Sequence, residues 1–300
     1  AGGSTAGAAG INQAYEVAKA NFLSDGNNRV ILCTDGDFNV GVSSDADLTA
    51  LIEKRREEGV FLSVLGFGMG NYKDSKMEKL ADKGNGNYAY IDNINEGKKN
   101  LVTQIGGTLL TIAKDVKIQV EFNPARVKAY RLLGYENRAL ADKDFYDDKK
   151  DAGEIGAGAS VTALYEIITD ESDPSLKEIS KTDKLKYQRT ETSATAAGGD
   201  EMATLKIRYK LPKENKSQLM EYTVKNQVKA LDKTSDDFRF ASAVASFGML
   251  LRDSKFKGNY TFDKVRELAV SAKGKDAEGY RAEFIRLVRD AKDLPKVAER

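Results

Sequence analysis

The hydrophobic pattern of the first third of the chain alternates between two periods. Apolar residues at Ile11, Tyr15, Ala18 and Phe22 recur at helical spacing, and short continuous apolar runs follow them. The predicted helices lie at 11–22, 45–58 and 77–84, with a longer one through Val102, Ile105, Leu109 and Ile112, and the predicted strands lie at 30–33, 60–65 and 88–91. Continuous apolar strands between helices are typical of a parallel sheet that is covered on both faces. We therefore predict a doubly wound, Rossmann-like α/β layer over residues 1–114.

After Lys114 the hydrophobic period changes to two. Val116, Ile118, Val120 and Phe122 alternate with polar residues, as in a strand with one buried face. Similar runs lie at 127–133, 161–168, 185–189, 203–211 and 220–224. Two polar stretches, 136–158 and 190–200, are predicted to be long loops. Because no helical period of useful length separates the strands, we predict an antiparallel β-sandwich over residues 115–234.

The last section, residues 235–300, is helical again. Ser235 is a predicted N-cap, since a serine oxygen accepts a hydrogen bond from the first turn of a helix. The helix that follows, 238–251, is apolar on two sides, so we expect it to pack against the body of the protein. Further helices are predicted at 261–273 and 280–291. The complete fold class is α/β plus all-β plus α.

Composition excludes several classes of function. The chain has 47 basic and 46 acidic residues, with no clustered basic face, so nucleic-acid binding is not expected. It has no His and one Cys, which excludes Ser-His-Asp and Cys-His catalysis, an ordinary zinc site and a disulfide within the chain. No apolar run approaches the roughly 20 residues of a membrane span. Any metal must therefore be a hard cation bound through oxygen. The lone Cys33 is expected to be buried.

A cluster of oxygen-bearing side chains follows the first apolar strand, at Asp35, Asp37 and Asn39. In doubly wound sheets, ligands bind outside the carboxyl ends of the strands, where Asp35 should lie. An EF-hand is excluded, because the sixth position of the loop is Val40 and the twelfth is Ala46. The spacing also resembles a phosphatase motif, Asp-x-Asp-x-Thr/Val, but its fifth position is Asn39.

Other interpretations of these residues stay open. An enzyme would use Asp35 or Asp37 as nucleophile or base, as in a metal-dependent phosphatase or hydrolase. Asp35 can also be a strand-end residue bonded to backbone amides, and Asp37 and Asn39 can simply shape a turn. The absence of His and the imperfect phosphatase spacing favour binding over catalysis.

A family resemblance connects this loop to an earlier segment. The string "GGSTAG" precedes the first helix and "TDGDFNVG" follows the first strand. Together they resemble two of the three loops of the metal-ion-dependent adhesion site (MIDAS) of von Willebrand factor A (VWA) domains. With "LLGYENRALADKDF" and "DFRFASAVASFGMLLRDS", the whole chain resembles bacterial VWA proteins of the YfbK type. The resemblance implies Thr5 and Asp35 as metal ligands, with weaker roles for Ser4 and Asp37, and Mg²⁺ or another divalent cation as the metal.

The resemblance also implies that part of the domain is absent. The third loop of the family, Asp-x-Ser-x-Ser, does not occur in this sequence. The family's strand order is 3-2-1-4-5-6, and the strands here match 4, 5 and 6. We therefore expect the chain to begin inside the VWA domain and its metal site to be incomplete. The strand at 30–33 should then be an edge that pairs with the missing N-terminal half or with a neighbouring copy.

The function implied is that of a non-enzymatic binding or adhesion module. Its metal would complete its coordination shell with an exposed carboxylate of a protein partner. Members of this family are usually exported and often lipid-anchored. The resemblance therefore implies a cell-envelope location, periplasmic or surface-exposed, with the anchor on the missing N-terminal part.

Overall fold

The computed structural model describes residues 7–35, 45–68, 73–135, 139–169, 172 and 199–294. The chain forms two compact units whose segments alternate along the sequence. Unit 1 comprises residues 1–119, 140–160 and 205–221, and unit 2 comprises residues 120–139, 161–204 and 222–300. The consecutive domains 1–114, 115–234 and 235–300 stay a prediction. None of the helices within the described residues is long and apolar enough to span a membrane.

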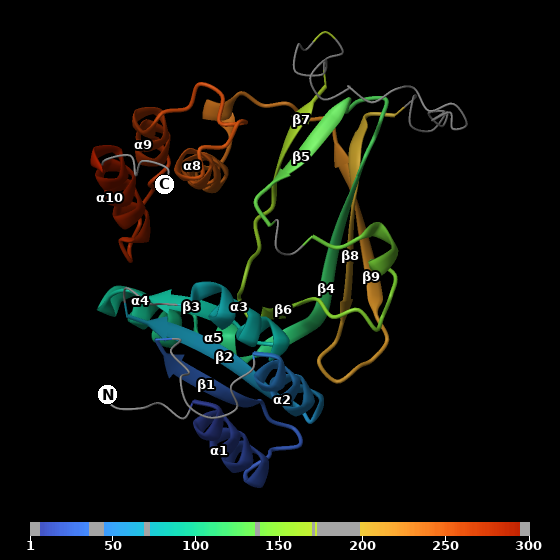
Figure 1. The fold of residues 1–300 in the computed structure, drawn as a ribbon. Helices are drawn as coiled ribbons and strands as arrows, with labels where there is room; N and C mark the ends of the chain where they lie inside the picture. The colour runs from blue at the N-terminus through green and yellow to red at the C-terminus, as the bar shows by residue number, and fades with distance from the viewer. Residues whose placement is uncertain are drawn as a thin grey trace. The chain divides into compact units, whose positions relative to one another are not determined.

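Unit 1 begins with the predicted α/β layer. Its elements are α1 (Gly7–Ala20), β1 (Asn28–Thr34), α2 (Asp45–Glu57), β2 (Val60–Phe67), α3 (Asp74–Lys83) and β3 (Tyr88–Ile91). The three strands lie side by side in a parallel sheet of order β1-β2-β3 (Figure 1). The parallel sheet is therefore confirmed, and its correspondence to strands 4, 5 and 6 of the family stays a prediction.

One hydrophobic core joins the three helices to one face of this sheet. Its buried residues are Ile11, Tyr15, Leu48, Ile52, Val60, Leu62, Val64, Met77, Leu80 and Ala81. Val30 and Leu32 of β1 pack against this core, whereas Ile31 and Cys33, which alternate with them, are exposed. The expectation that Cys33 is buried was therefore wrong. Among the described residues no strand pairs with the outer side of β1, so its predicted edge position is confirmed.

The predicted long helix through Val102 and Ile112 was wrong at its C-terminal end. The chain instead forms α4 (Ile94–Lys98), a π-helical turn (Lys99–Thr103), α5 (Ile105–Leu109) and the long strand β4 (Thr111–Phe122). A close backbone approach explains the break, because a Cβ on Gly156 would lie 1.6 Å from the carbonyl oxygen of Gly107. Ile112 therefore belongs to a strand that begins earlier than its period-two pattern indicates.

Antiparallel strand pairs follow, as predicted. A four-stranded sheet has the order β6-β4-β8-β9, with β6 (Gly153–Gly156), β8 (Glu201–Lys210) and β9 (Gln218–Lys225). A two-stranded sheet in unit 2 pairs β5 (Ala129–Leu133) with β7 (Leu164–Ile168). The loop predicted at 136–158 was wrong in part, because it contains β6. The run at 185–189 lies outside the described residues, and the sandwich arrangement stays a prediction.

A bulge in β4 changes which side chains are buried. The register with β6 shifts between Ala113 and Val116, and Asp115 has a positive φ of 52°. An extra residue at a bulge moves the following side chains relative to the two faces of the strand. Accordingly Lys117, predicted to face solvent, is 2% exposed, whereas Ile118 is 45% exposed.

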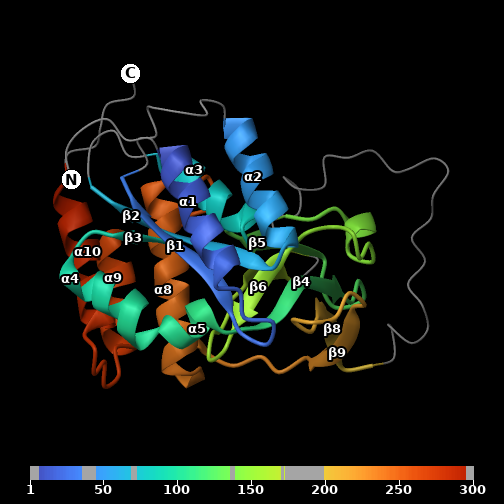
Figure 2. The same ribbon diagram turned by 90° about the horizontal axis from the view of Figure 1, so that it is seen from below.

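Unit 2 ends in three helices, α8 (Asp236–Leu251), α9 (Phe262–Ser271) and α10 (Tyr280–Asp293), which lie together (Figure 2). The side chain of Ser235 accepts a hydrogen bond from the Phe238 amide, so the predicted N-cap is confirmed. A core of Ala243, Val265, Ala269 and Val288 joins the three helices. One apolar side of α8 packs in this core, as expected; on its other side Val244 and Leu251 are exposed, and Met249 lines a groove beside β5 and β7.

Candidate functional site

Asp35 lies immediately beyond the carboxyl end of β1 and is exposed. In the parallel register Thr34 pairs with Gly66 and Phe67 pairs with Ile91, so all three strands end at one edge of the sheet. This is the edge at which doubly wound sheets bind ligands. The structure therefore places Asp35 where the sequence predicted, while its role as a metal ligand stays a prediction.

Gly68, the residue that follows β2, lies beside Asp35. A Cβ added to Gly68 would lie 3.6 Å from the Cβ of Asp35, and Gly68 has a φ of 97° that favours glycine. The hydroxyl of Tyr90 on β3 donates a hydrogen bond of 2.6 Å to the carbonyl oxygen of Gly68. Tyr90 thus fixes the position of Gly68 beside Asp35. The sequence pattern did not indicate this role, because Tyr90 belongs to an ordinary strand.

Asp92, which sequence reasoning also missed, lies at the same edge after β3. Its Oδ1 accepts a hydrogen bond of 2.9 Å from the side-chain amide of Asn93, and Asn93 caps α4. Two strand spacings separate Asp92 from Asp35, or roughly 10 Å. This is a separation between strand backbones, and Asp92 has its own hydrogen bond to Asn93.

The other predicted ligands, Thr5, Ser4 and Asp37, lie outside the described residues. Asp35 supplies a hard, exposed oxygen, which fits the ligand preference of Mg²⁺. In the described part of the chain, no group of three neighbouring acidic side chains includes Asp35. Asp35 therefore supplies one carboxylate at this edge, and a complete ion site needs further oxygen donors.

A second concentration of charge in unit 1 was not predicted. One carboxylate oxygen each from Asp115, Asp151 and Glu154 lie within 4.8 Å of one another. Asp115 is on the bulge of β4, Glu154 is on β6, and Asp151 comes just before β6. No pattern along the chain indicated the cluster, because it depends on a short glycine-containing strand inside a polar stretch.

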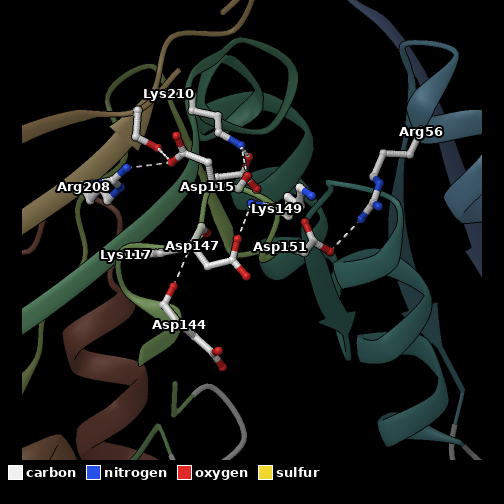
Figure 3. Close-up of polar contacts among 11 residues, drawn as sticks. Arg56, Asp115, Lys117, Asp144, Asp147, Lys149, Asp151, Arg208 and Lys210 are labelled. Atoms are coloured by element: carbon white, nitrogen blue, oxygen red, sulfur yellow. Dashed lines mark hydrogen bonds and ion pairs between the residues drawn. The ribbon is translucent and has the colours of Figure 1, made fainter. Parts of the chain in front are cut away.

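Basic side chains from other elements pair with two of these three carboxylates. The ammonium group of Lys210, on β8, donates to Asp115 at 2.6 Å and to the carbonyl oxygen of Asp148 at 2.7 Å. Arg56, on α2, donates to Asp151 at 2.6 Å (Figure 3). Lys210 is 7% exposed. The Lys210–Asp115 ion pair is therefore largely shielded from water, which strengthens the attraction between its two charges.

The surrounding strand segments are held by further buried charges. The ammonium of Lys117 donates to the backbone carbonyl oxygens of Asp144 and Asp147, and burial lowers the pKa of Lys117 (Figure 3). Hydrogen bonds from Ser217 and Arg208 lower the pKa of Asp148 to about 2. These contacts fix residues 144–148 next to β4 and β8.

Glu154 differs from its two neighbours. Burial is the largest cause that raises the pKa of its carboxyl group to about 8; the carboxylates of Asp151 and Asp115 act in the same direction, and Arg56 and Arg29 oppose them. Its buried Oε1 has no hydrogen-bond partner among the described residues. The guanidinium of Arg29 donates instead to the hydroxyls of Ser63 and Thr111, at 2.8 and 3.2 Å. Glu154 is therefore protonated at neutral pH.

Comparison with known proteins gives a consistent family match. The family model described as "Uncharacterized protein YfbK, C-terminal" matches residues 107–294. An Escherichia coli (strain K12) protein, described as "Uncharacterized protein YfbK", is 42% identical over 297 residues. The match covers 99% of this chain and 50% of the relative, so the chain spans about half the length of that protein.

Comparison with solved structures gave matches of low TM-score. A von Willebrand factor type A protein from Catenulispora acidiphila is 13% identical, with a TM-score of 0.42 and coverage of 96% of this chain and 63% of that one. The conserved hypothetical protein BatB from Bacteroides thetaiotaomicron is 21% identical, with a TM-score of 0.27 and coverage of 32% of this chain and 57% of that one.

Proposed function

Because the chain belongs to the family described as "Uncharacterized protein YfbK, C-terminal", we propose that it is part of a binding module and not of an enzyme. In this proposal a divalent cation, Mg²⁺ or a similar ion, is held in a MIDAS-type site. Asp35 is the acidic ligand and Thr5 the hydroxyl ligand, with weaker contributions from Ser4 and Asp37. The ion recognises an exposed carboxylate on a protein partner.

The exposed carboxylate of Asp35 at the carboxyl edge of the parallel sheet is the observation that carries this proposal. The neighbouring Gly68 brings no side chain against Asp35, which supports this proposal. When bound, the cation supplies a positive charge with an open coordination position for an anionic oxygen. The residues of this chain orient the ion, and its specificity for carboxylates follows from the hard-cation chemistry.

The alternative is a metal-dependent phosphatase or hydrolase that uses Asp35 and Asp37. Two observations favour binding: the chain has no His, and the fifth position of the phosphatase-like motif is Asn39 instead of Thr or Val. The release of phosphate from p-nitrophenyl phosphate in the presence of Mg²⁺ separates the two. Turnover that is lost in Asp35→Asn would favour the enzyme.

The proposal includes the edge strand β1. Ile31 is 37% exposed on an edge without a described partner, and natural proteins usually protect such edges. We expect β1 to pair with the N-terminal half of the VWA domain or with a neighbouring copy. The cell-envelope location and the lipid anchor, which the family resemblance implies, belong to this same proposal.

Titration calorimetry on the full-length polypeptide tests the metal site. Asp35→Ala should abolish Mg²⁺ binding, and Asp37→Ala should only weaken it. Asp92→Ala is the matched control, because Asp92 is exposed at the same edge but lies roughly 10 Å away. Its Mg²⁺ affinity should equal that of the wild type. Unchanged Mg²⁺ affinity in Asp35→Ala, with a native circular dichroism spectrum, would refute the assignment.

A further inference from the structure

The carboxylate cluster of unit 1 contains one acid, Glu154, with a buried oxygen that accepts no hydrogen bond from the described residues. Lys210 donates to Asp115 and Arg56 donates to Asp151, whereas Oε1 of Glu154 is buried without a hydrogen-bond partner in the described residues. Ionisation of Glu154 would place a third negative charge within 4.8 Å of the other two carboxylates. In a buried environment such like charges repel strongly.

The strand that carries Glu154 is attached weakly. β6 has four residues, and its register with β4 consists of three pairs interrupted by two shifts, with Thr111 opposite Gly156 and Val116 opposite Gly153. One further backbone hydrogen bond of 2.8 Å joins the Ala157 amide to the carbonyl oxygen of Leu110. Short, interrupted strands of this kind open locally without unfolding the rest of the protein.

We propose that Asp115, Asp151 and Glu154 form a proton-dependent latch, in which a proton on Glu154 holds β6 against β4 and loss of this proton weakens the attachment. The charged groups that act on Glu154 are Asp151 on its own segment, Asp115 on β4, Arg56 on α2 and Arg29 on β1. Among the charged groups beyond them, Lys210 on β8 donates to Asp115, Lys117 on β4 donates to the carbonyl oxygen of Asp144, and Arg208 on β8 donates to Asp148. This inference concerns a different place from the proposed metal site and does not depend on it.

The pH range follows from proton linkage. The closed latch binds the proton with a pKa of about 8, whereas an open, solvated Glu154 would have an ordinary pKa near 4.5. Between these two values, each unit of pH increases the ratio of open to closed latch by about tenfold. Above pH 8 both states are ionised, and the ratio levels off. The latch is therefore tight in mild acid and progressively weaker toward pH 8.

Hydrogen–deuterium exchange of residues 150–158 tests the latch in the whole chain. After correction for the intrinsic rate, protection should fall about tenfold per pH unit between pH 5.5 and 7.5, and become constant above pH 8. In Glu154→Gln this pH dependence should disappear. The matched control is Glu166→Gln on β7, where the carboxylate is exposed and paired with Arg131 in unit 2. This control should keep the wild-type profile.

Two outcomes would overturn the latch: protection of residues 150–158 that does not change with pH in the wild type, or the same pH profile in Glu154→Gln. A second measurement covers the case in which Glu154→Gln fails to fold. The ¹³C carboxyl resonance of Glu154 in the wild-type chain should titrate near pH 8. Titration near pH 4.5 in the folded protein would refute the proposal independently of any variant.

Discussion

Replacing Gly86 by Ala should destabilise unit 1 severely, whereas the same substitution at Gly10 should stabilise it. Gly86 lies between α3 and β3, against the backbone of β2. A Cβ at this position would lie 1.8 Å from the carbonyl oxygen of Leu62 and 2.9 Å from the amide nitrogen of Ser63. Because these atoms belong to the backbone of the central strand, they cannot rotate away as the end of a side chain would.

The size of the effect follows from these distances. Ordinary contact begins at 3.4 Å, so the gap to the Leu62 oxygen falls short by 3.4 − 1.8 = 1.6 Å. Overpacking of a core costs about 1–3 kcal/mol and occasionally more, and we expect the upper end of this range here. Gly10 lies in α1, and a Cβ added there would meet no heavy atom within 4 Å outside the adjacent helix backbone. Ala is preferred over Gly in a helix by about 0.5–1 kcal/mol. The two substitutions should therefore have opposite signs.

Urea unfolding followed by far-UV circular dichroism measures the free energy of unfolding of both variants. Hydrogen exchange at β2 locates the effect, because the Leu62 amide donates to the carbonyl oxygen of Gly84 at 2.8 Å and the Val64 amide to that of Asn87 at 2.9 Å. In Gly86→Ala these amides should exchange faster. A Gly86→Ala protein within about 0.5 kcal/mol of the wild type would show that the packing of this turn against β2 has been misjudged.

The proposed metal site, the helix α8 and the buried Glu154 each lead to a further prediction. The 300-residue chain alone should show little or no Mg²⁺ binding in calorimetry, since Thr5 and Asp35 supply only two of the expected ligands; tight binding would contradict this. Limited proteolysis of the native chain should spare residues 234–255, because α8 packs on α9 and α10, and rapid cleavage there would show a loose tail. The folded-state pKa of Glu154 exceeds its ordinary value of 4.5, so its destabilising effect is absent below pH 4.5 and complete at pH 8. Glu154→Gln should therefore raise the free energy of unfolding at pH 8 by at most about 5 kcal/mol and leave it unchanged at pH 4.5. Equal effects of the substitution on urea unfolding at both pH values would contradict this.

The α/β layer could be predicted because its pattern is local. β1 and β2 are continuous apolar runs, and Gly59, at a φ of 88°, ends α2 where the sequence indicated. A strand of this kind delivers whatever follows it to the carboxyl edge of the sheet, so the position of Asp35 was predictable as well. Tyr90 and Asp92 were missed because their importance depends on which strands become neighbours.

The charged cluster could not be predicted, because it arises from a deviation in strand geometry. In a period-two pattern, charged residues are assigned to the solvent face, and Lys117 was assigned there. The bulge at Asp115 instead buries Lys117 and exposes Ile118. The strand β6, with two glycines among its four residues, carries no hydrophobic alternation that would reveal it. Long-range pairing thus overrides the local pattern at both positions.

The alternation of the two units along the sequence has a consequence for truncation and for the order of folding. The chain passes from one unit to the other five times, at 119/120, 139/140, 160/161, 204/205 and 221/222. No single truncation of the chain can therefore yield either unit intact. Folding must also close a loop of some eighty residues before the Asn123 amide can reach the Met202 carbonyl oxygen, and such non-local closures slow folding. Nascent chains that end before β8 would expose the unpaired side of β4, so synthesis through β8 is a condition for this sheet to form.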